Sequence, residues 1–262
     1  LDGTLFPYTT LFRSVFTFGV NIISVIYRIS KSSYIRGKQC LKSLYLHKYF
    51  GKDRDPLPEE RRLRFKAGHE IGFKAHQLFP GGINLAPPHA TKYGAYSKLT
   101  QEYIQKSEPV LYEPSFIYEE VLVALDILVF DNGWHAYEVK SSVQISDTYL
   151  QDAALQYHVI TASGLRLKDF SIIHLTRHHK EISGDEPADE LFQITSVKEN
   201  CINKNEEVRS AIEELRKILN APGIPKIEMG EQCKKPYDCD FMGFCKRQKA
   251  LIEAARFKTI DM

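Results

Sequence analysis

Three charged residues near the middle of the chain have types and a spacing that could bind a metal ion and orient a water molecule. Asp126 interrupts the apolar run VLVALDILVF, and Glu138 and Lys140 lie two apart in the next run, WHAYEVKSS. A carboxylate inside a buried strand is costly unless it is paired or binds a metal ion. Side chains two apart on a strand point the same way, so Glu138 and Lys140 share one face of the expected sheet.

The turn between these two runs decides whether Asp126 joins the pair. A two-residue loop at 132–133 would place Asp126 opposite Val139 and hide it from Glu138. A three-residue loop at 131–133, with a left-handed glycine in a bulge, would place Asp126 opposite Glu138. We predict the three-residue loop, which sets two carboxylates side by side on adjacent strands.

A carboxylate pair with a neighbouring lysine suits hydrolysis of a phosphodiester. Carboxylate oxygens hold Mg²⁺ or Mn²⁺, and the ion polarises the phosphoryl oxygen and helps to activate water. The lysine would orient or deprotonate that water. The same pattern, D-x₁₁-E-x-K, also occurs as a solvated cluster on a surface hairpin, so the spacing alone leaves both interpretations open.

Glu113 is a further carboxylate whose position depends on a turn. It would face Asp126 if Glu119 and Glu120 formed a two-residue turn between their strands. Two glutamates are a poor turn pair, so we expect a structural role for Glu113.

The elements that must position these residues follow from hydrophobic periodicity and turn residues. Helical spacing predicts helices over residues 34–50, 59–79, 89–107, 146–164, 203–220 and 243–255. Runs rich in Val, Ile, Tyr and Phe predict strands over residues 111–120, 121–130, 134–142, 170–177 and 191–197. Helices followed by a strand meander, a crossover helix and further strands indicate an α/β fold with a mixed sheet.

The five cysteines form a second pattern. Cys233, Cys239 and Cys245 follow the spacing C-x₅-C-x₅-C, and Cys40 lies near the other end of the chain. Disulfide frameworks belong to short secreted domains, so we interpret these cysteines as ligands in a reducing cytoplasm. Zinc sites usually have shorter spacings, and the ferredoxin run differs too, so spacing alone does not name the metal. Cys201 matches nothing and is expected to be structural.

The acidic and basic motifs resemble those of the PD-(D/E)XK nuclease superfamily. Asp126-Ile127-Leu128 and Glu138-Val139-Lys140-Ser141 match its central motifs. Within it, the chain is most similar to the RecB-like branch, which includes the CRISPR-associated iron–sulfur exonucleases, and to an uncharacterised bacterial subgroup of that branch. The resemblance covers about residues 29–245. It implies a restriction-endonuclease-like core with a mixed sheet flanked by helices.

The resemblance also implies further site residues. A histidine on an upstream helix is a metal ligand in this branch, and His69 in AGHEIG stands at that place, with His76 as the second choice. Gln156 in ALQYH matches a glutamine that lies near the DNA and the catalytic lysine. The branch places a tyrosine four residues after that glutamine, whereas Tyr157 follows Gln156 directly. The match to the motif therefore includes Gln156 but not Tyr157.

Iron–sulfur members of the branch hold a [4Fe–4S] cluster with one cysteine before the core and three after it. The resemblance therefore implies Cys40, Cys233, Cys239 and Cys245 as cluster ligands. Such a cluster would join the first helix to the C-terminal segment, and its assembly would be part of folding. A zinc ion in its place, or four reduced cysteines without a metal, are the alternatives.

The implied function is a metal-dependent DNA exonuclease or single-strand nuclease. Asp126, Glu138 and His69 would hold Mg²⁺ or Mn²⁺, and Lys140 and Gln156 would be catalytic. DNA, as single strands or ends, is the implied partner, although a net charge of +2 neither shows nor excludes a basic face. A module of the same fold that binds nucleic acid without cleaving it is the alternative function.

The first residues of the chain carry a separate signal. Residues 4–14, TLFPYTTLFRS, match the translation of a widely used short-read sequencing adapter. We therefore expect residues 1–25 to lie outside the fold and residues 26–262 to form one domain, with a helical part (30–107), a core (108–200) and a C-terminal segment (201–262). The apolar run 15–26 is shorter than the ~20 residues that span a bilayer. We expect a cytoplasmic protein without a membrane anchor, and a chain that continues into a further domain.

Overall fold

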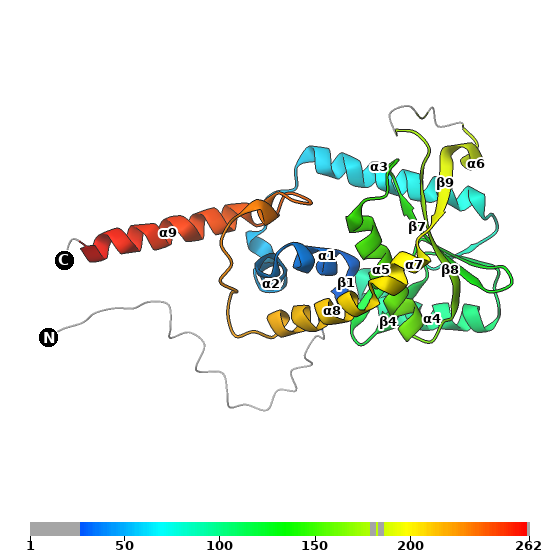
Figure 1. Ribbon diagram of the computed structural model, residues 1–262, viewed down its shortest axis with the longest axis horizontal. Helices are drawn as coiled ribbons and strands as arrows, with labels where there is room; N and C mark the ends of the chain where they lie inside the picture. Colours follow the sequence, from blue (N-terminus) through cyan, green and yellow to red (C-terminus); the bar gives the residue numbers. More distant parts are fainter. Residues whose placement is uncertain (1–26, 179–181, 183–185, 261–262) are drawn as a thin grey trace.

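The computed structural model describes residues 27–178, 182 and 186–260, with side chains described as far as residue 253. The adapter-like segment and the rest of residues 1–25, for which we expected no part in the fold, lie outside the described residues. In Figure 1 the strands lie in the right-hand half of the molecule, α3 passes above them, and α9 extends away to the left.

The elements agree closely with the predicted ones. The α-helices are α1 (Lys31–Gln39), α2 (Leu41–Tyr49), α3 (Glu59–Ala75), α4 (Tyr93–Gln105), α5 (Asp147–Ala162), α6 (Ala188–Leu191), α7 (Lys198–Asn203), α8 (Asn205–Leu219) and α9 (Met242–Ile260). Short 3₁₀ helices are η1 (Gly51–Asp53), η2 (His76–Leu78), η3 (Ala90–Lys92) and η5 (Glu231–Cys233). The strands are β1 (Ile29–Ser30), β2 (Ile83–Asn84), β3 (Val110–Tyr112), β4 (Ser115–Tyr118), β5 (Val121–Ala124), β6 (Ile127–Phe130), β7 (Trp134–Lys140), β8 (Leu167–Leu175) and β9 (Phe192–Ser196).

The strands form two sheets, one ordered β1-β5-β4 and the other β2-β3-β6-β7-β8-β9. β6 and β7 pair antiparallel, and β7 and β8 pair parallel across the crossover helix α5. The larger sheet is therefore mixed, and the predicted α/β class is confirmed. Ser146 caps α5 by accepting a hydrogen bond from the Tyr149 N–H, and Gly164 follows that helix with φ +102°.

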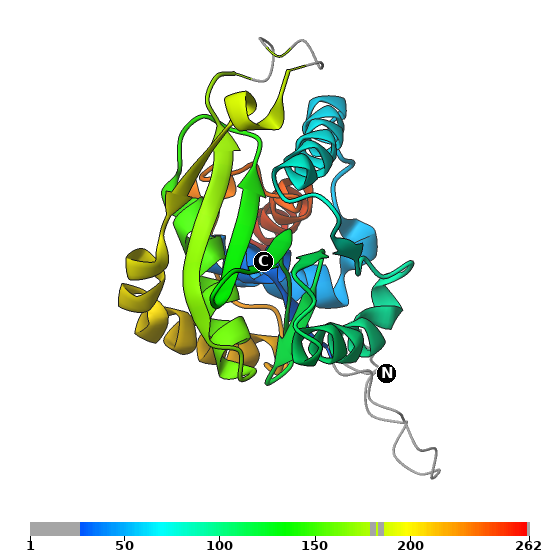
Figure 2. The ribbon, with the colours of Figure 1, turned by 90° about the vertical axis from the view of Figure 1, so that its right-hand side faces the viewer.

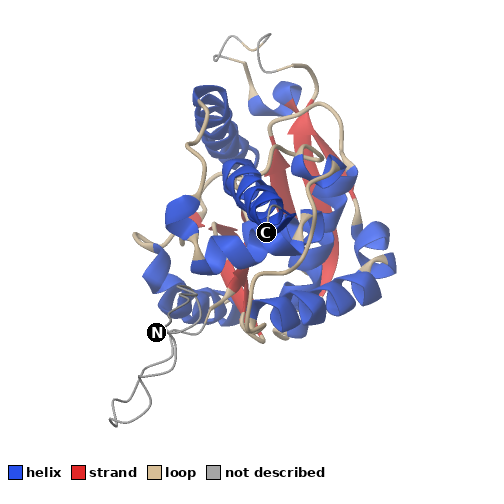
Figure 3. Cartoon of the chain, turned by 90° about the vertical axis from the view of Figure 1, so that its left-hand side faces the viewer, coloured by secondary structure: helices blue, strands red, loops and turns tan. Residues whose placement is uncertain are grey.

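The six-stranded sheet has a hydrophobic layer on each face. Phe170 and Ile172 of β8 pack towards α5, whereas Ile173 and Leu175 pack with Ile71 of α3 on the other face. Figure 2 shows α3 on one side of β7 and β8, with α7 and α8 on the other. Figure 3 shows the strands lying behind a layer of helices when the molecule is viewed from its other end. Glu138 and Lys140 alternate with Val139, and so lie on the α5 face.

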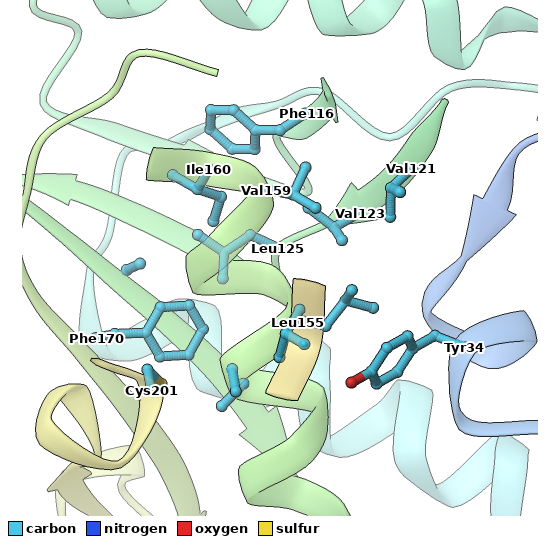
Figure 4. Close-up of a cluster of buried hydrophobic side chains, with 14 of the residues drawn as sticks. Tyr34, Phe116, Val121, Val123, Leu125, Leu155, Val159, Ile160, Phe170 and Cys201 are labelled. Atoms are coloured by element: carbon cyan, nitrogen blue, oxygen red, sulfur yellow. The ribbon is translucent and has the colours of Figure 1, made fainter. Parts of the chain in front are cut away.

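Helix α5 supplies the centre of the larger hydrophobic core. Leu155, Val159 and Ile160 lie on this helix, and Val159 is close to Val123 of β5 (Figure 4). All four side chains are fully buried. This packing fixes the rotation of α5, and with it the direction in which its polar residues point.

The structure differs from the sequence prediction at the first helix. Residues 34–50 were expected to form one helix, but Cys40 has an extended conformation (φ −162°, ψ 113°) and separates α1 from α2. The break lies next to a contact with the C-terminal segment, where Gln39 Nε2 donates to the carbonyls of Gln232 (2.7 Å) and Tyr237 (2.6 Å). The prediction of one continuous helix was wrong, because local periodicity does not contain contacts with a distant segment.

The long strands predicted over residues 111–120 and 121–130 are each broken in the middle. β3 ends at Tyr112 and β4 begins at Ser115, while β5 ends at Ala124 and β6 begins at Ile127. The resulting hairpin passes from the small sheet into the large one. Both breaks contain a carboxylate, Glu113 in the first and Asp126 in the second, so the bend between the sheets is where these acids lie.

Candidate active site

The β6–β7 hairpin has the register that the sequence predicted. Phe130 pairs with Trp134 and Ile127 with Tyr137, which leaves a three-residue loop in which Asn132 has φ +48° and Gly133 φ +134°. The predicted three-residue loop is confirmed. The paired register ends at Ile127 with Tyr137, and Asp126, the residue before Ile127, lies close enough to Glu138 for the two carboxylates to interact electrostatically.

Glu138 is buried and contacts two lysines. Its Oε1 accepts a hydrogen bond from Lys140 Nζ at 2.7 Å, and Lys31 Nζ of α1 lies 3.0 Å from both carboxylate oxygens. Burial alone would raise the pKa of Glu138, but the charges of Lys140 and Lys31 outweigh it and hold the pKa well below its usual range. Glu138 is therefore ionised at neutral pH.

Lys140 joins β7 to the crossover helix. Its Nζ donates to Asp152 Oδ2 at 2.6 Å and lies 5.2 Å from the centre of the Tyr149 ring. Burial would lower the pKa of Lys140, yet the carboxylates of Asp152 and Glu138 raise it well above its ordinary value. The ammonium group therefore stays protonated at neutral pH.

Asp126 is the carboxylate with the least charge compensation. Its Oδ2 accepts the backbone N–H of Val139 at 2.5 Å. Burial, and then the charge of Glu138, raise the pKa of Asp126 to about 8, although Lys31 acts against the shift. Burial and the neighbouring carboxylate therefore favour the protonated form of Asp126 when no metal ion is bound.

Glu113 lies opposite Asp126, because the turn that we judged unfavourable does form. Glu119 and Glu120 do form the two-residue turn, with φ +45° and +61°, so Tyr118 pairs with Val121. The backbone N–H of Glu113 donates to the Asp126 carbonyl at 2.9 Å. Burial raises the pKa of Glu113, and the charges of Lys31 and His69 oppose this shift.

The two polar residues of α5 that face the cluster are incompletely bonded. Gln156 is fully buried, and it lies close enough to Glu138 to lower the pKa of that carboxyl. Neither amide atom of Gln156 has a hydrogen bond of normal geometry to any described residue, and the same is true of Asp152 Oδ1. Buried polar atoms without partners are rare and indicate a missing water, ion or ligand. We call Asp126, Glu138, Lys140, Asp152 and Gln156 the carboxylate–lysine cluster.

Two members of this neighbourhood were missed in the sequence. Asp152 precedes Gln156 by one helical turn, so their shared face of α5 was a usable signal. Lys31 gave no local signal, because it reaches Glu138 from 107 residues away. Ser30 caps α1 by accepting from the Ser33 N–H, which places Lys31 in the first turn of that helix.

The remaining candidates from the sequence, His69, His76 and Tyr157, are not part of the carboxylate–lysine cluster. His69 is exposed on α3, and its charge reaches Glu113. His76 stacks on Tyr112, with ring centres 3.9 Å apart, and belongs to the packing of η2. Tyr157 packs against the hydrophobic core and meets Phe170 edge to face.

No metal site is preformed in the described part of the chain. Among those residues, no group of three or more His, Cys, Asp or Glu side chains could hold a metal ion as the side chains stand. The contacts explain this for the carboxylates, because Glu138 is engaged by Lys140 and Lys31, and Asp126 by a backbone N–H. A metal ion at this site requires these side chains to move.

The four cysteines implied as cluster ligands meet at one place. Cys40, Cys233, Cys239 and Cys245 all line a single small cavity between the α1–α2 junction and the C-terminal segment. All five cysteines lie in the described part of the chain and are free thiols. Burial raises the pKa of Cys40 and of Cys245. Cys201 is buried in the hydrophobic core instead, as expected for a structural residue.

The length and hydropathy of the helices show whether any of them could cross a membrane. Within residues 27–178, 182 and 186–260, the structure contains no helix that is both long enough and apolar enough to cross a membrane.

Comparison with known proteins gives low similarity. No family model and no curated protein matches the chain. Among solved structures, the chain is similar to LHK-Exo in complex with dAMP, at 11% identity over 74% of this chain and 90% of that one, with a TM-score of 0.39. It is also similar to the alkaline exonuclease LHK-Exo from Laribacter hongkongensis, at 12% identity over the same shares, with a TM-score of 0.32. These values assign the chain to no family.

Proposed function

We propose that this protein is a metal-dependent nuclease of the PD-(D/E)XK type that hydrolyses phosphodiester bonds in DNA, as an exonuclease or single-strand nuclease. The observation that carries the proposal is the buried contact between Lys140 and Glu138 beside Asp126, at the bend of the hairpin. Carboxylates can bind a hard cation such as Mg²⁺, and an ammonium group next to them can hold a water molecule against a phosphate.

The carboxylates fit a divalent cation by their charge. The raised pKa of Asp126, about 8, is caused by burial and by the neighbouring charge of Glu138. An Mg²⁺ or Mn²⁺ ion held by these two carboxylates, with His69 as a further ligand, would relieve that repulsion. When bound, such an ion polarises a phosphoryl oxygen and lowers the pKa of a bound water.

Lys140 would act as a hydrogen-bond donor and a positive charge. Its Nζ donates to Asp152 and to Glu138, and these two carboxylates raise the pKa of Lys140 well above its ordinary value. Lys140 would orient the attacking water and offset the charge that develops on the phosphate. The unsatisfied amide of Gln156, beside Glu138, would hold that water or the DNA strand.

We further propose that the four clustered cysteines hold a [4Fe–4S] cluster. What supports the proposal is that all four thiols line one cavity between the α1–α2 junction and the C-terminal segment. Thiolates are ligands of both iron–sulfur clusters and zinc, and the C-x₅-C-x₅-C spacing is longer than that of usual zinc sites. The cluster would fasten Cys40 to the C-terminal segment and would make assembly a step of folding. Because all five cysteines are free thiols, we propose a cytoplasmic location.

A nucleic-acid-binding module without cleavage activity is the second candidate function. It is favoured by Lys31, whose ammonium group contacts both oxygens of Glu138 where an ion would bind. Purified protein incubated with Mn²⁺ or Mg²⁺ and end-labelled single-stranded DNA separates the two. Shortened DNA supports the nuclease, and binding without shortening under every divalent ion tested supports the module.

A further inference from the structure

A second cavity begins at Lys140 and runs along the molecule towards the C-terminal segment. Its volume is about 380 Å³, within the size range of small-molecule sites. Its walls come from α1, α3, α5 and β7, and from residues 237–240 next to the cysteine cavity.

Three aromatic rings line this cavity. They are Phe65 of α3, Tyr149 of α5 and Tyr237 of the C-terminal segment. Phe65 is 50% exposed and Tyr237 is 43% exposed, although both are large apolar rings at the cavity wall. Aromatic rings that stay accessible beside cations are the surfaces on which unpaired bases stack.

Positive charge gathers at the end of the cavity away from Lys140. Asp240 is buried there and forms ion pairs with Arg36 (2.7 Å), Arg54 (2.6 Å) and Arg61. Asp238 also lines the cavity, so the three guanidinium groups face two carboxylates and one positive charge is left over. Arg36 and Arg61 also line the cavity, so a phosphate group entering it would meet guanidinium donors.

One buried carboxylate oxygen in the wall of this cavity accepts no hydrogen bond from the described residues. Asp152 lines the cavity, and its Oδ1 is buried with no hydrogen-bond partner among the residues that the structure describes. Its other oxygen accepts from Lys140. A ligand that supplies an N–H or O–H group would satisfy this oxygen, and nucleobases and deoxyribose ends carry such groups.

We propose that this cavity binds one unstacked nucleotide of a single DNA strand, with its base against Tyr237, Tyr149 and Phe65 and a flanking phosphate at Arg36 and Arg61. This proposal rests on the proposed nuclease function, because it places that nucleotide next to the phosphate that Lys140 serves. A base in a duplex is held in its stack, so the cavity selects single strands or frayed ends over paired DNA.

The test is a binding measurement without metal, so that it does not depend on cleavage. The probe is a fluorescein-labelled ten-residue oligothymidylate, followed by fluorescence anisotropy in EDTA. Tyr237→Ala and Phe65→Ala should each weaken binding roughly tenfold, in line with the loss of one stacked base. Phe73→Ala is the matched control, since Phe73 is an exposed ring on the same helix outside the cavity.

The outcomes separate this inference from the proposed function. Weak binding by both cavity variants, with normal binding by Phe73→Ala and by Tyr237→Phe, supports the nucleotide site even if no metal ion produces cleavage. Thermal melting checks that each variant is folded. Equal affinity of all variants overturns the inference, as does a wild-type preference for a blunt duplex of the same length, even if the protein cleaves DNA.

Discussion

Lys31 and Glu138 are 107 residues apart in the sequence, and the ammonium group of Lys31 lies 3.0 Å from both carboxylate oxygens of Glu138. This contact joins the first helix to the central strand at the site where we propose a metal ion. Burial would lower the pKa of Lys31, but Glu138, Asp152 and Asp126 raise it, so its positive charge persists at neutral pH. Lys31 therefore balances the carboxylates when no divalent ion is present.

The first prediction is that Lys31 competes with the metal ion. Lys31→Met removes one of the two ammonium groups on Glu138, so Mn²⁺ should bind at least fivefold more tightly, measured by isothermal titration calorimetry at constant pH. Lys38→Met is the control, because Lys38 pairs with the exposed Glu207 far from the cluster. Unchanged or weaker Mn²⁺ binding by Lys31→Met would show that Lys31 does not occupy the ion's place.

The second prediction concerns pH. The pKa of Asp126 is about 8 in the fold, against an ordinary value of 3.8, so between these values the folded protein holds a proton that the unfolded chain has lost. Because the folded protein binds this proton more tightly than the unfolded chain does, the free energy of unfolding falls as the pH rises from 3.8 towards 8. Asp126→Asn, which cannot ionise, should therefore gain at least about 1 kcal/mol over wild type between pH 5 and pH 8.5.

The measurement is urea unfolding of both proteins in EDTA at several pH values. Glu138 does not mask the effect, because its lowered pKa affects stability only at acidic pH, where the unfolded carboxyl takes up a proton. A constant difference between Asp126→Asn and wild type across this range would contradict the raised pKa.

The third prediction concerns the cysteines. Cys40→Ser and Cys239→Ser should each lose the iron and acid-labile sulfide of anaerobically purified protein, because each removes a thiolate from the shared cavity. Cys201→Ser is the matched control, since Cys201 is buried in the hydrophobic core, where burial raises its pKa to about 12. Wild-type protein that contains one zinc and no iron would exclude the iron–sulfur cluster.

The fourth prediction concerns Asp240, which pairs with three arginines in the wall of the proposed nucleotide cavity, next to the cysteine cavity. Asp240→Asn leaves Arg36, Arg54 and Arg61 clustered without their common partner, and should lower the free energy of unfolding by about 3 kcal/mol. Urea unfolding measures this loss. Glu60→Gln, which breaks an exposed helical ion pair with Arg64, should have no measurable effect, and equal effects of the two substitutions would count against a structural role for Asp240.

The closeness of Asp126 to Glu138 could be predicted because it depends on local chemistry. Asn132 and Gly133 accept positive φ values, and they fix the loop length and with it the register of the hairpin. Gln156 could be found from its motif. The sequence also indicated most helices and strands, since their periodicities are carried by the residues of each segment.

The features that escaped prediction depend on distant contacts. Glu119 and Glu120 form a turn that their own propensities disfavour. The strands on either side, β4 and β5, pair in the small sheet, and their continuations β3 and β6 pair in the large sheet, so Glu113 lies opposite Asp126. The break at Cys40 lies next to hydrogen bonds from Gln39 to the C-terminal segment. No window of the sequence contains both partners of such contacts.

The central claim is that the carboxylate–lysine cluster hydrolyses DNA. The most direct measurement is the single-turnover rate of Mn²⁺-dependent cleavage of end-labelled single-stranded DNA by wild type, Lys140→Met and the control Lys38→Met. Loss of one preorganised donor at a reaction centre typically costs about 100-fold or more in rate. We predict that loss for Lys140→Met and a wild-type rate for Lys38→Met. Cleavage by Lys140→Met at the wild-type rate would contradict the account.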